Sequence, residues 1–562
     1  MKRMKRLCCL LLALLCLTGC ASPATEEPAT APDSSGAALD TQPPAAQTAE
    51  QTDLAVAQIK QLGESPDDNY RTFYEVFVYS YCDSNADGIG DIAGLTSKLD
   101  YLQNLGITGL WLMPIHPSQS YHKYDVRDYY DIDPQYGTLA DFDAFMAECQ
   151  KRDIHVIMDL VLNHTGDDHS WFLTAVDYLK TLPAGAEPDP AACPYVDYYF
   201  FSREGGAGYH EIPGTDWKYE GMFSPDMPDV NFANEAVWGE IEKIMRFWIE
   251  KGVSGFRLDA AKEFYSGNVT KNIEVLSRIQ QTATSIKPDC YLVAEVWENF
   301  NQIARYYESG ITSIFNFAFG NADGKITKVI RGAGNPSVVS TYATALEKAD
   351  AAYLASNPNY IDAPFLSNHD VGRIAGFANR DENKIKLAGA MNILMSGSCF
   401  IYYGEELGMP GSGNDPSKRA PMLWNEARND GTTNPPPECQ LPEEYPLGSL
   451  ELQKNDDSSV YSYYRQVIAL RNALPVISHG RTTCETELNV GCVSAQRKTW
   501  NEETCIILMN IDEQGAEVNL SGYTDWETVR YLSANGEDFL RDPAANTLYI
   551  PAYGIAVLQP VA

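Results

Sequence analysis

The chain has 562 residues, of which 44% are hydrophobic, 11% are aromatic and 21% are charged, and its formal net charge is −34. This length can hold one barrel of about 250 residues together with further domains. The strong negative charge argues against nucleic acid or an anionic membrane surface as a direct partner, because both carry negative charge themselves.

The first 20 residues have the pattern of a bacterial export signal. Residues 1–6 are basic, residues 7–17 form an apolar core, and Leu17-Thr-Gly-Cys20 follows. The apolar core is too short to span a membrane. Its ending resembles the bacterial lipobox, which implies that Cys20 is lipid-modified and becomes the first mature residue. We therefore interpret residues 1–20 as a lipoprotein signal peptide; an ordinary signal with a chance cysteine is the alternative.

Residues 21–68 are rich in Ala, Pro, Thr, Glu and Gln and contain few large apolar side chains. Such a segment cannot bury enough surface to fold, so it is predicted to be a disordered tether. Together with the signal peptide it predicts an exported protein. We expect this protein to lie at the bacterial cell membrane or cell surface and to contact the membrane only through its lipid.

Eight short apolar runs follow, separated mostly by helical patterns, as in residues 95–105 and 238–251. Alternating helices and buried strands predict a parallel α/β architecture, and eight strands suit a (β/α)₈ TIM barrel. The barrel is expected in two parts, residues 69–163 and 231–475. The predicted strands are 73–78, 110–113, 156–160, 255–259, 291–295, 311–315, 365–370 and 399–402.

The pattern changes after about residue 475. Short strands at 505–509, 517–520 and 547–550 are separated by turn residues. Residues 476–562 are therefore predicted to form an all-β C-terminal domain.

Three acidic residues, Asp259, Glu295 and Asp370, end three of the predicted barrel strands. A charge at the end of a buried strand is costly unless it is paired or used. In a barrel of this kind the carboxyl ends of the strands meet at one mouth, where active sites lie. Three carboxylates at one mouth are typical of glycoside chemistry. The alternative is three unrelated acids that cap loops or pair with arginine.

The motifs around these acids resemble those of the α-amylase superfamily of glycoside hydrolases, in the family order and from about residue 72 to the C-terminus. They are Asp159-Leu-Val-Leu-Asn-His164, Met227-Pro-Asp-Val-Asn231, Gly255-Phe-Arg-Leu-Asp259, Ala294-Glu-Val-Trp297, Ser367-Asn-His-Asp370 and Phe400-Ile-Tyr-Tyr-Gly-Glu-Glu406. The resemblance implies an inserted domain after the third strand, at residues 164–230, that forms one wall of the cleft.

Asp259 is the predicted nucleophile. It lies two residues after Arg257, so both side chains point to the same face of a strand, and the guanidinium would keep the carboxylate ionised. Glu295 is the predicted general acid and base, because an apolar setting and neighbouring carboxylates should raise its pKa. The resemblance implies the same two roles.

The resemblance also implies a set of substrate contacts. His369 and Asp370 would hold hydroxyls of the sugar at the cleavage point, with Asp370 as the third essential acid, and His164 would contact the same sugar. Tyr124 could stack on a pyranose face and Asp125 could accept from its hydroxyls. Lys262 is followed by Glu263 where the amylase pattern has His, which leaves specificity open. The predicted substrate-binding set is Tyr124, Asp125, His164, Arg257, Lys262, Trp297 and His369.

The segment Asp83-Ser-Asn-Ala-Asp-Gly-Ile-Gly-Asp91 places oxygen ligands at alternate positions, as calcium loops do. Its twelfth position is Gly94 instead of the Glu of an EF-hand. In the family, the loop after the first strand binds a structural Ca²⁺; a solvated turn is the alternative reading. The predicted ligands are Asp83, Asn85, Asp87, the Ile89 carbonyl and Asp91.

We therefore predict a retaining hydrolase of α-glucans such as starch, maltodextrins and malto-oligosaccharides. Within the superfamily, α-glucosidase, oligo-1,6-glucosidase, neopullulanase and glucanotransferase activities remain open. A different class of function is a catalytically inactive glucan-binding or scaffold lipoprotein. The oligomeric state cannot be read from the sequence.

Overall fold

The computed structural model describes residues 68–429 and 431–561. The predicted signal peptide with Cys20, and the predicted tether through residue 67, lie outside the described residues. Within the described ranges, no helix is long and apolar enough to cross a membrane.

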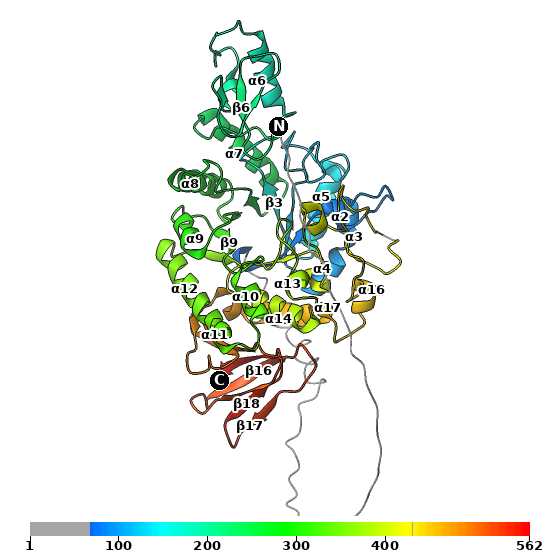
Figure 1. Cartoon of the computed structure of the whole chain (residues 1–562), viewed down its shortest axis with the longest axis vertical. Coiled ribbons are helices and arrows are strands. Elements are labelled where there is room, and N and C mark those ends of the chain that lie inside the picture. Colours follow the sequence, from blue (N-terminus) through cyan, green and yellow to red (C-terminus); the bar gives the residue numbers. More distant parts are fainter. Residues whose placement is uncertain (1–67, 430, 562) are drawn as a thin grey trace, which may run out of the picture. The chain divides into compact units, whose positions relative to one another are not determined.

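Eight parallel strands form one nearly closed sheet, in the order β10-β9-β8-β7-β3-β2-β1-β11. The strands β3 and β9 of this sheet are labelled in Figure 1. A parallel bridge between Phe365 and Phe400 links the two outer edges of the sheet. The sheet confirms the predicted (β/α)₈ barrel. Its strands are β1 (Thr72–Val76), β2 (Gly109–Leu112), β3 (His155–Leu160), β7 (Gly255–Leu258), β8 (Tyr291–Ala294), β9 (Ser313–Phe315), β10 (Ile361–Ala363) and β11 (Cys399–Tyr402).

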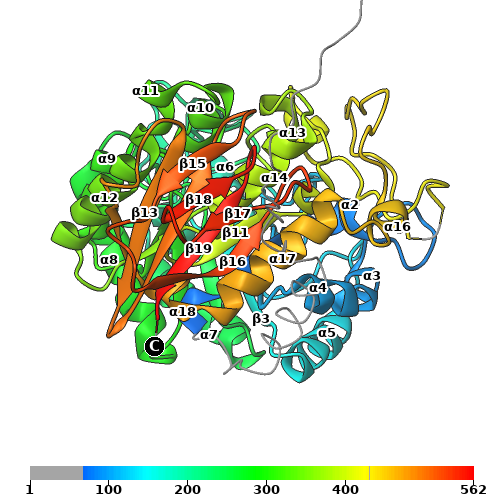
Figure 2. The same cartoon turned by 90° about the horizontal axis from the view of Figure 1, so that it is seen from below.

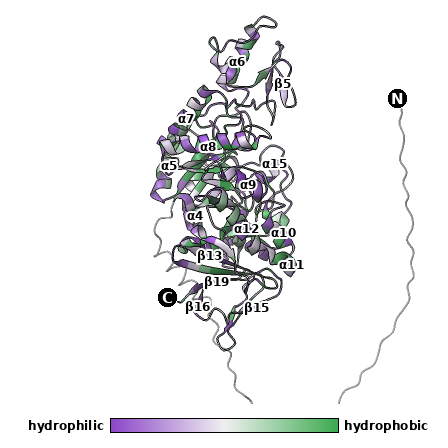
Figure 3. Ribbon diagram, turned by 90° about the vertical axis from the view of Figure 1, so that its left-hand side faces the viewer, coloured by the Kyte–Doolittle hydropathy of each residue, from purple (hydrophilic) through white to green (hydrophobic). Residues whose placement is uncertain are grey.

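Several helices of the barrel are amphipathic, and Figure 3 shows mixed purple and green ribbon along them, whereas α14 (Glu382–Ile393) is buried along most of its length. In α7 (Glu235–Glu250), buried Trp238, Ile241, Met245 and Trp248 recur at helical spacing and pack inward. The other principal helices are α3 (Ile92–Ser97), α4 (Leu99–Leu105), α5 (Leu139–Lys151), α8 (Val269–Ile286), α9 (Phe300–Tyr307), α10 (Lys325–Arg331), α12 (Thr341–Ser356), α14 (Glu382–Ile393) and α17 (Val460–Ala473).

Short helical segments fill several connections of the barrel. They are α2 (Val78–Tyr81), α11 (Pro336–Val339), α13 (Ile374–Phe377), α15 (Asp415–Lys418), α16 (Leu450–Gln453) and α18 (Pro475–His479).

The inside of the barrel is a packed core. Phe73, Trp111, Val293, Phe315 and Phe400 belong to one buried cluster contributed by the barrel strands. Because side chains fill the barrel itself, the room for a ligand lies at the mouth above this cluster.

The prediction of a strand at residues 365–370 is wrong. The seventh barrel strand is β10, which ends at Ala363, and the segment after it is a loop. Pro364 has no backbone N–H, so it cannot continue the ladder, although its carbonyl still accepts from Phe400 N at 2.8 Å. His369 and Asp370 therefore lie on a loop beyond the strand.

An inserted segment lies between β3 and α7 and is drawn at the top of Figure 1. It contains helix α6 (Ser170–Thr181), which the sequence did not reveal, and a small antiparallel sheet in the order β4-β6-β5. Those strands are β4 (Phe201–Ser202), β5 (Tyr209–Glu211) and β6 (Lys218–Glu220).

The C-terminal region is all-β, as predicted, and its strands are orange and red in Figure 2. Two antiparallel sheets, in the orders β12-β13-β14-β19-β16 and β15-β18-β17, share one apolar core. The strands are β12 (Arg481–Cys484), β13 (Val493–Trp500), β14 (Glu503–Asn510), β15 (Ala516–Asn519), β16 (Trp526–Leu532), β17 (Leu540–Asp542), β18 (Thr547–Ile550) and β19 (Ile555–Pro560).

Candidate active site

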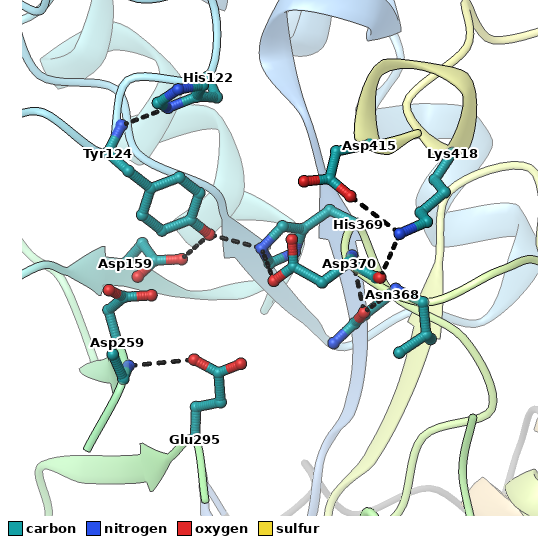
Figure 4. A network of polar contacts seen from close by, with 12 residues as sticks. His122, Tyr124, Asp159, Asp259, Glu295, Asn368, His369, Asp370, Asp415 and Lys418 are labelled. Carbon is teal, nitrogen blue, oxygen red and sulfur yellow. Dashed lines mark hydrogen bonds and ion pairs between the residues drawn. The ribbon is translucent and has the colours of Figure 1, made fainter. Parts of the chain in front are cut away.

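Asp259 and Glu295 directly follow two neighbouring barrel strands, β7 and β8. The two strands pair in parallel with Leu258 opposite Ala294, so the two acids leave the sheet side by side. The backbone N–H of Ala260 donates to Glu295 Oε2 at 3.0 Å, which ties the two strand ends together (Figure 4). Two of the three predicted catalytic acids thus lie next to each other at the barrel mouth.

Arg257 lies beneath these carboxylates with its side chain only 1% exposed. Its Nη1 donates to Asp259 Oδ1 at 2.5 Å and to Asp159 Oδ1 at 2.7 Å, while Nη2 donates to Glu295 Oε2 at 2.7 Å. One guanidinium therefore orients three acids. Such charge-assisted bonds are strong and directional, so they fix the positions of both predicted reactive carboxylates.

The electrostatics of the site distinguish its acids. Burial raises the pKa of Glu295, and the nearby carboxylates of Asp259 and Asp370 add to this against the opposing effect of Arg257. Burial likewise raises the pKa of Asp159 to about 7. A raised pKa favours the protonated form of a carboxyl group, which is the form that a general acid requires.

Asp370 reaches the same mouth from the loop after β10. Its Oδ2 lies 2.9 Å from His369 Nε2, and its Oδ1 accepts from Arg419 Nη2 at 2.8 Å. These cations outweigh the effect of burial and hold the pKa of Asp370 well below its usual range. The hydroxyl of Tyr124 lies 2.7 Å from the same His369 nitrogen and donates to Asp159 at 3.0 Å (Figure 4).

The three acids open into one cleft of about 1060 Å³. This volume accommodates a ligand of several sugar rings. Both polar and aromatic side chains line it, including Tyr121, His122, Tyr124, Asp125, His164, Phe223, Asp259, Glu295, Trp297, Asp370 and Arg419.

The predicted substrate contacts occupy different places around this cleft. Trp297 is 44% exposed and its ring stacks on Phe317 at 4.8 Å, so one aromatic face is supported from behind. His164 lines the cleft although it is 3% exposed, and its Nε2 has no hydrogen-bond partner in the described ranges. A buried polar atom without a partner suits a sugar hydroxyl.

Four other predicted contacts are buried or engaged by other groups of the protein. Arg257 and His369 lie beneath the lining of the cleft, and Lys262 pairs with Glu298 at 3.5 Å. Asp125 is 4% exposed, and its carboxylate accepts from Ser118 Oγ at 2.7 Å and from the backbone N–H groups of Gln119 and Ser120. The substrate-binding roles of these residues stay predictions.

In the predicted calcium loop, carboxylate oxygens accept hydrogen bonds from the backbone of the loop itself. Asp83 accepts from the N–H groups of residues 85, 86 and 88, and Asp87 accepts from that of Ile89. The carboxylate of Asp91 is used differently, since it caps α3 through Gly94 N and also binds Ser84. In the described ranges no three His, Cys, Asp or Glu side chains are grouped to hold a metal ion. A cation here would therefore need the Asn85 oxygen and the Ile89 carbonyl as well as the carboxylates of the loop.

Sequence reasoning assigned no role to Glu75, Asp159 and Arg419, each of which directly contacts a predicted site residue. The signal for two of them was present, because Glu75 and Asp159 interrupt the apolar runs of β1 and β3 just as the three predicted acids end theirs. Arg419 lies in the long connection after β11, where no local pattern marks it.

The amino-acid sequence and the fold are both similar to those of known proteins. The catalytic-domain family of alpha amylase matches residues 75–480. The chain is similar to Alpha-amylase 3 of Dictyoglomus thermophilum, with 40% identity over 419 residues, covering 73% of this chain and 78% of the relative. It is also similar to Glucan 1,6-alpha-glucosidase of Streptococcus pneumoniae, with 30% identity over 462 residues, covering 70% and 82% respectively. The solved structure of Eubacterium rectale Amy13B matches with a TM-score of 0.85 and 43% identity, covering 90% of this chain and 99% of that one.

Proposed function

Since this chain belongs to the α-amylase family and is a glycoside hydrolase acting on α-glucans, we propose that it cleaves them with retention of configuration. The observation that supports this most directly is the shared guanidinium of Arg257, which holds the Asp259 and Glu295 carboxylates side by side. Retaining enzymes need two carboxyl groups close together, whereas inverting enzymes place them farther apart to admit a water.

In the proposed first step, the Asp259 carboxylate attacks the anomeric carbon and forms a glycosyl ester. The bond to the leaving oxygen breaks as Glu295 gives that oxygen its proton. In the second step the Glu295 carboxylate removes a proton from water, and the water oxygen displaces Asp259. Two inversions restore the α configuration. The raised pKa of Glu295 suits the first step, and its contact with Arg257 suits the ionised form in the second.

Proton NMR during the first minutes of maltotriose cleavage tests this mechanism. We expect the newly formed reducing end to appear first as the α-anomer and to reach the β-anomer only by mutarotation. Initial release of the β-anomer would contradict both the mechanism and the nucleophile role of Asp259.

The preferred linkage is a separate question, because relatives of both α-amylase and α-1,6-glucosidase type resemble this chain. We propose α-amylase-like action on α-1,4 bonds as the main activity. Product analysis on starch, maltotriose, isomaltose, pullulan and cyclodextrin separates this from α-glucosidase, oligo-1,6-glucosidase, neopullulanase and glucanotransferase activities. If the protein binds at least one of these five substrates but cleaves none of them, the scaffold function is favoured.

We further propose that the protein is exported and anchored by lipid at Cys20, on the basis of Leu17-Thr-Gly-Cys20 and the segment that follows. Labelled palmitate should enter the wild-type chain and a Cys16→Ser control, and should not enter Cys20→Ser. A labelled Cys20→Ser chain, or an unlabelled wild type, would refute the anchor. A structural Ca²⁺ at residues 83–91 is likewise our proposal.

A further inference from the structure

Glu75 is a buried carboxylate on β1 that belongs to none of the motifs described above. It lies two residues after Phe73, whose side chain is in the barrel core, so it points to the same inner side of the strand. It is 1% exposed and does not line the cleft. A carboxylate in such a place is costly unless it is paired, so its partner indicates its use.

The partner of Glu75 is His369, which is 294 residues away in the sequence. The Glu75 Oε1 atom lies 2.6 Å from His369 Nδ1 and accepts from the His369 backbone N–H at 3.3 Å. The other ring nitrogen, Nε2, lies 2.9 Å from Asp370 Oδ2. Glu75, His369 and Asp370 thus form a chain of contacts from the barrel core to the cleft.

The ring of His369 is held firmly in this chain. It is fully buried, stacks on the ring of Tyr124 at 5.5 Å and meets the edge of Trp111 at 5.6 Å. A carboxylate faces each ring nitrogen. A neutral ring has one bare nitrogen lone pair, which would face the Glu75 or the Asp370 carboxylate, depending on the tautomer. The geometry is therefore satisfied best when both nitrogens carry a proton.

The charges around the ring agree with this arrangement. Burial disfavours the charged ring, but the carboxylates of Asp370 and Glu75 outweigh it and raise the pKa of His369 to about 9. The titratable and charged groups that surround the ring are Glu75 on β1, Tyr124 after β2, Asp159 on β3, Arg257 on β7, the adjacent Asp370, and Arg419 after β11.

We propose that Glu75 is a positioning residue for the reaction, whose carboxylate orients the His369 ring so that Nε2–H holds Asp370 in the cleft. This inference rests on the proposed function in one respect: it assumes that Asp370 lies beside the sugar that is cleaved. Glu75 itself contacts no substrate and acts through His369. With Glu75 ionised, the doubly protonated ring persists to higher pH.

The substitution Glu75→Gln tests the proposal, because it preserves the shape and a hydrogen-bond acceptor while removing the charge. Loss of an adjacent opposite charge should lower the pKa of His369 by roughly 1 to 3 units. Nitrogen-15 NMR of labelled histidine in the full chain, assigned with His369→Asn, measures this titration directly. The alkaline limb of the kcat/KM profile on maltotriose should move to lower pH with it.

Glu406→Gln is the matched control. Glu406 is also a fully buried glutamate, but it accepts from the hydroxyls of Tyr74 and Tyr101, and among the described residues it has no hydrogen bond or ion pair to the lining of the cleft. Its substitution should leave both the His369 titration and the kcat/KM profile unchanged. Equal behaviour of a folded Glu75→Gln variant and this control would overturn the proposal.

The wild-type spectrum provides a test that does not depend on a folded variant. At pH 7.5 both ring nitrogens of His369 should be protonated, and a neutral ring would overturn the proposal. The failures are distinguishable: if the wild type does not cleave α-glucans, the proposed function is wrong while the NMR measurement still decides the role of Glu75. If cleavage occurs and the titration is unchanged by Glu75→Gln, only this inference is wrong.

Discussion

At the scale of single residues, Arg257 determines the electrostatics of the site. Its buried guanidinium contacts the carboxylates of Asp159, Asp259 and Glu295. One positive charge against three acids leaves excess negative charge, which favours a proton on at least one of them. The raised pKa values of Asp159 and Glu295 follow from burial and, to a smaller extent, from this crowding of carboxylates. The site therefore combines Asp370, whose pKa is lowered, with Asp159 and Glu295, whose pKa values are raised.

Asp259→Asn and Glu295→Gln should each lower kcat on maltotriose by roughly 10³-fold or more, because one removes the nucleophile and the other the proton donor. Glu263→Gln is the control, since Glu263 is a neighbouring acid that does not line the cleft. Melting curves should show all three variants folded. A folded Asp259→Asn or Glu295→Gln variant with activity near that of Glu263→Gln would refute the assigned role.

At the scale of elements, the loop between α2 and α3 combines a tight fold with exposed oxygens. Gly88 has a φ of +93°, a left-handed conformation that favours glycine at the sixth position of the loop. The turns place the side chains of Asn85 and Asp87 at the surface, while Asp91 is buried at the start of α3. A cation bound here would link the first strand's connection to the helix that follows.

Chelation should therefore lower the melting temperature of the wild type, because an ion that binds only the native state stabilises it. Asp87→Ala should remove most of this response. Asp542→Ala is the control, since Asp542 accepts from two backbone N–H groups in a similar exposed turn between β17 and β18. Equal melting temperatures of the wild type with and without chelator, after metal removal has been verified, would refute the site.

At the scale of the whole molecule, buried acids make stability depend on pH. Burial raises the pKa of Asp159 and Asp229 to about 7 and that of Glu405 to about 8. In the unfolded chain such groups have pKa values of about 4. The native state therefore binds their protons more tightly, and this stabilisation is complete below about pH 4 and is lost as the pH rises through 7 to 8.

The melting temperature should accordingly fall as the pH rises from about 6 to 8, and Glu405→Gln should make this fall shallower by removing one of the titrating groups. Glu405 Oε2 accepts from Ser367 Oγ and Oε1 accepts from Tyr464 OH. In glutamine the amide oxygen can accept from one of these hydroxyls while the amide N–H donates to the other. Glu451→Gln, at an exposed position, is the control and should retain the wild-type slope. An identical slope in Glu405→Gln would show that Glu405 does not titrate as described.

The sequence alone determined the parallel barrel, the all-β C-terminal region and the α-amylase family. Apolar runs, turn residues and short motifs that end in acids are local patterns, so they can be recognised along the chain without the structure. It also pointed to Asp259, Glu295 and Asp370, which line one cleft. Only the tertiary structure decided what holds them. Arg419 reaches Asp370 across 49 residues, and Glu75 reaches His369 across 294. Such pairs depend on how strands and loops meet in space, and no spacing along the chain encodes that.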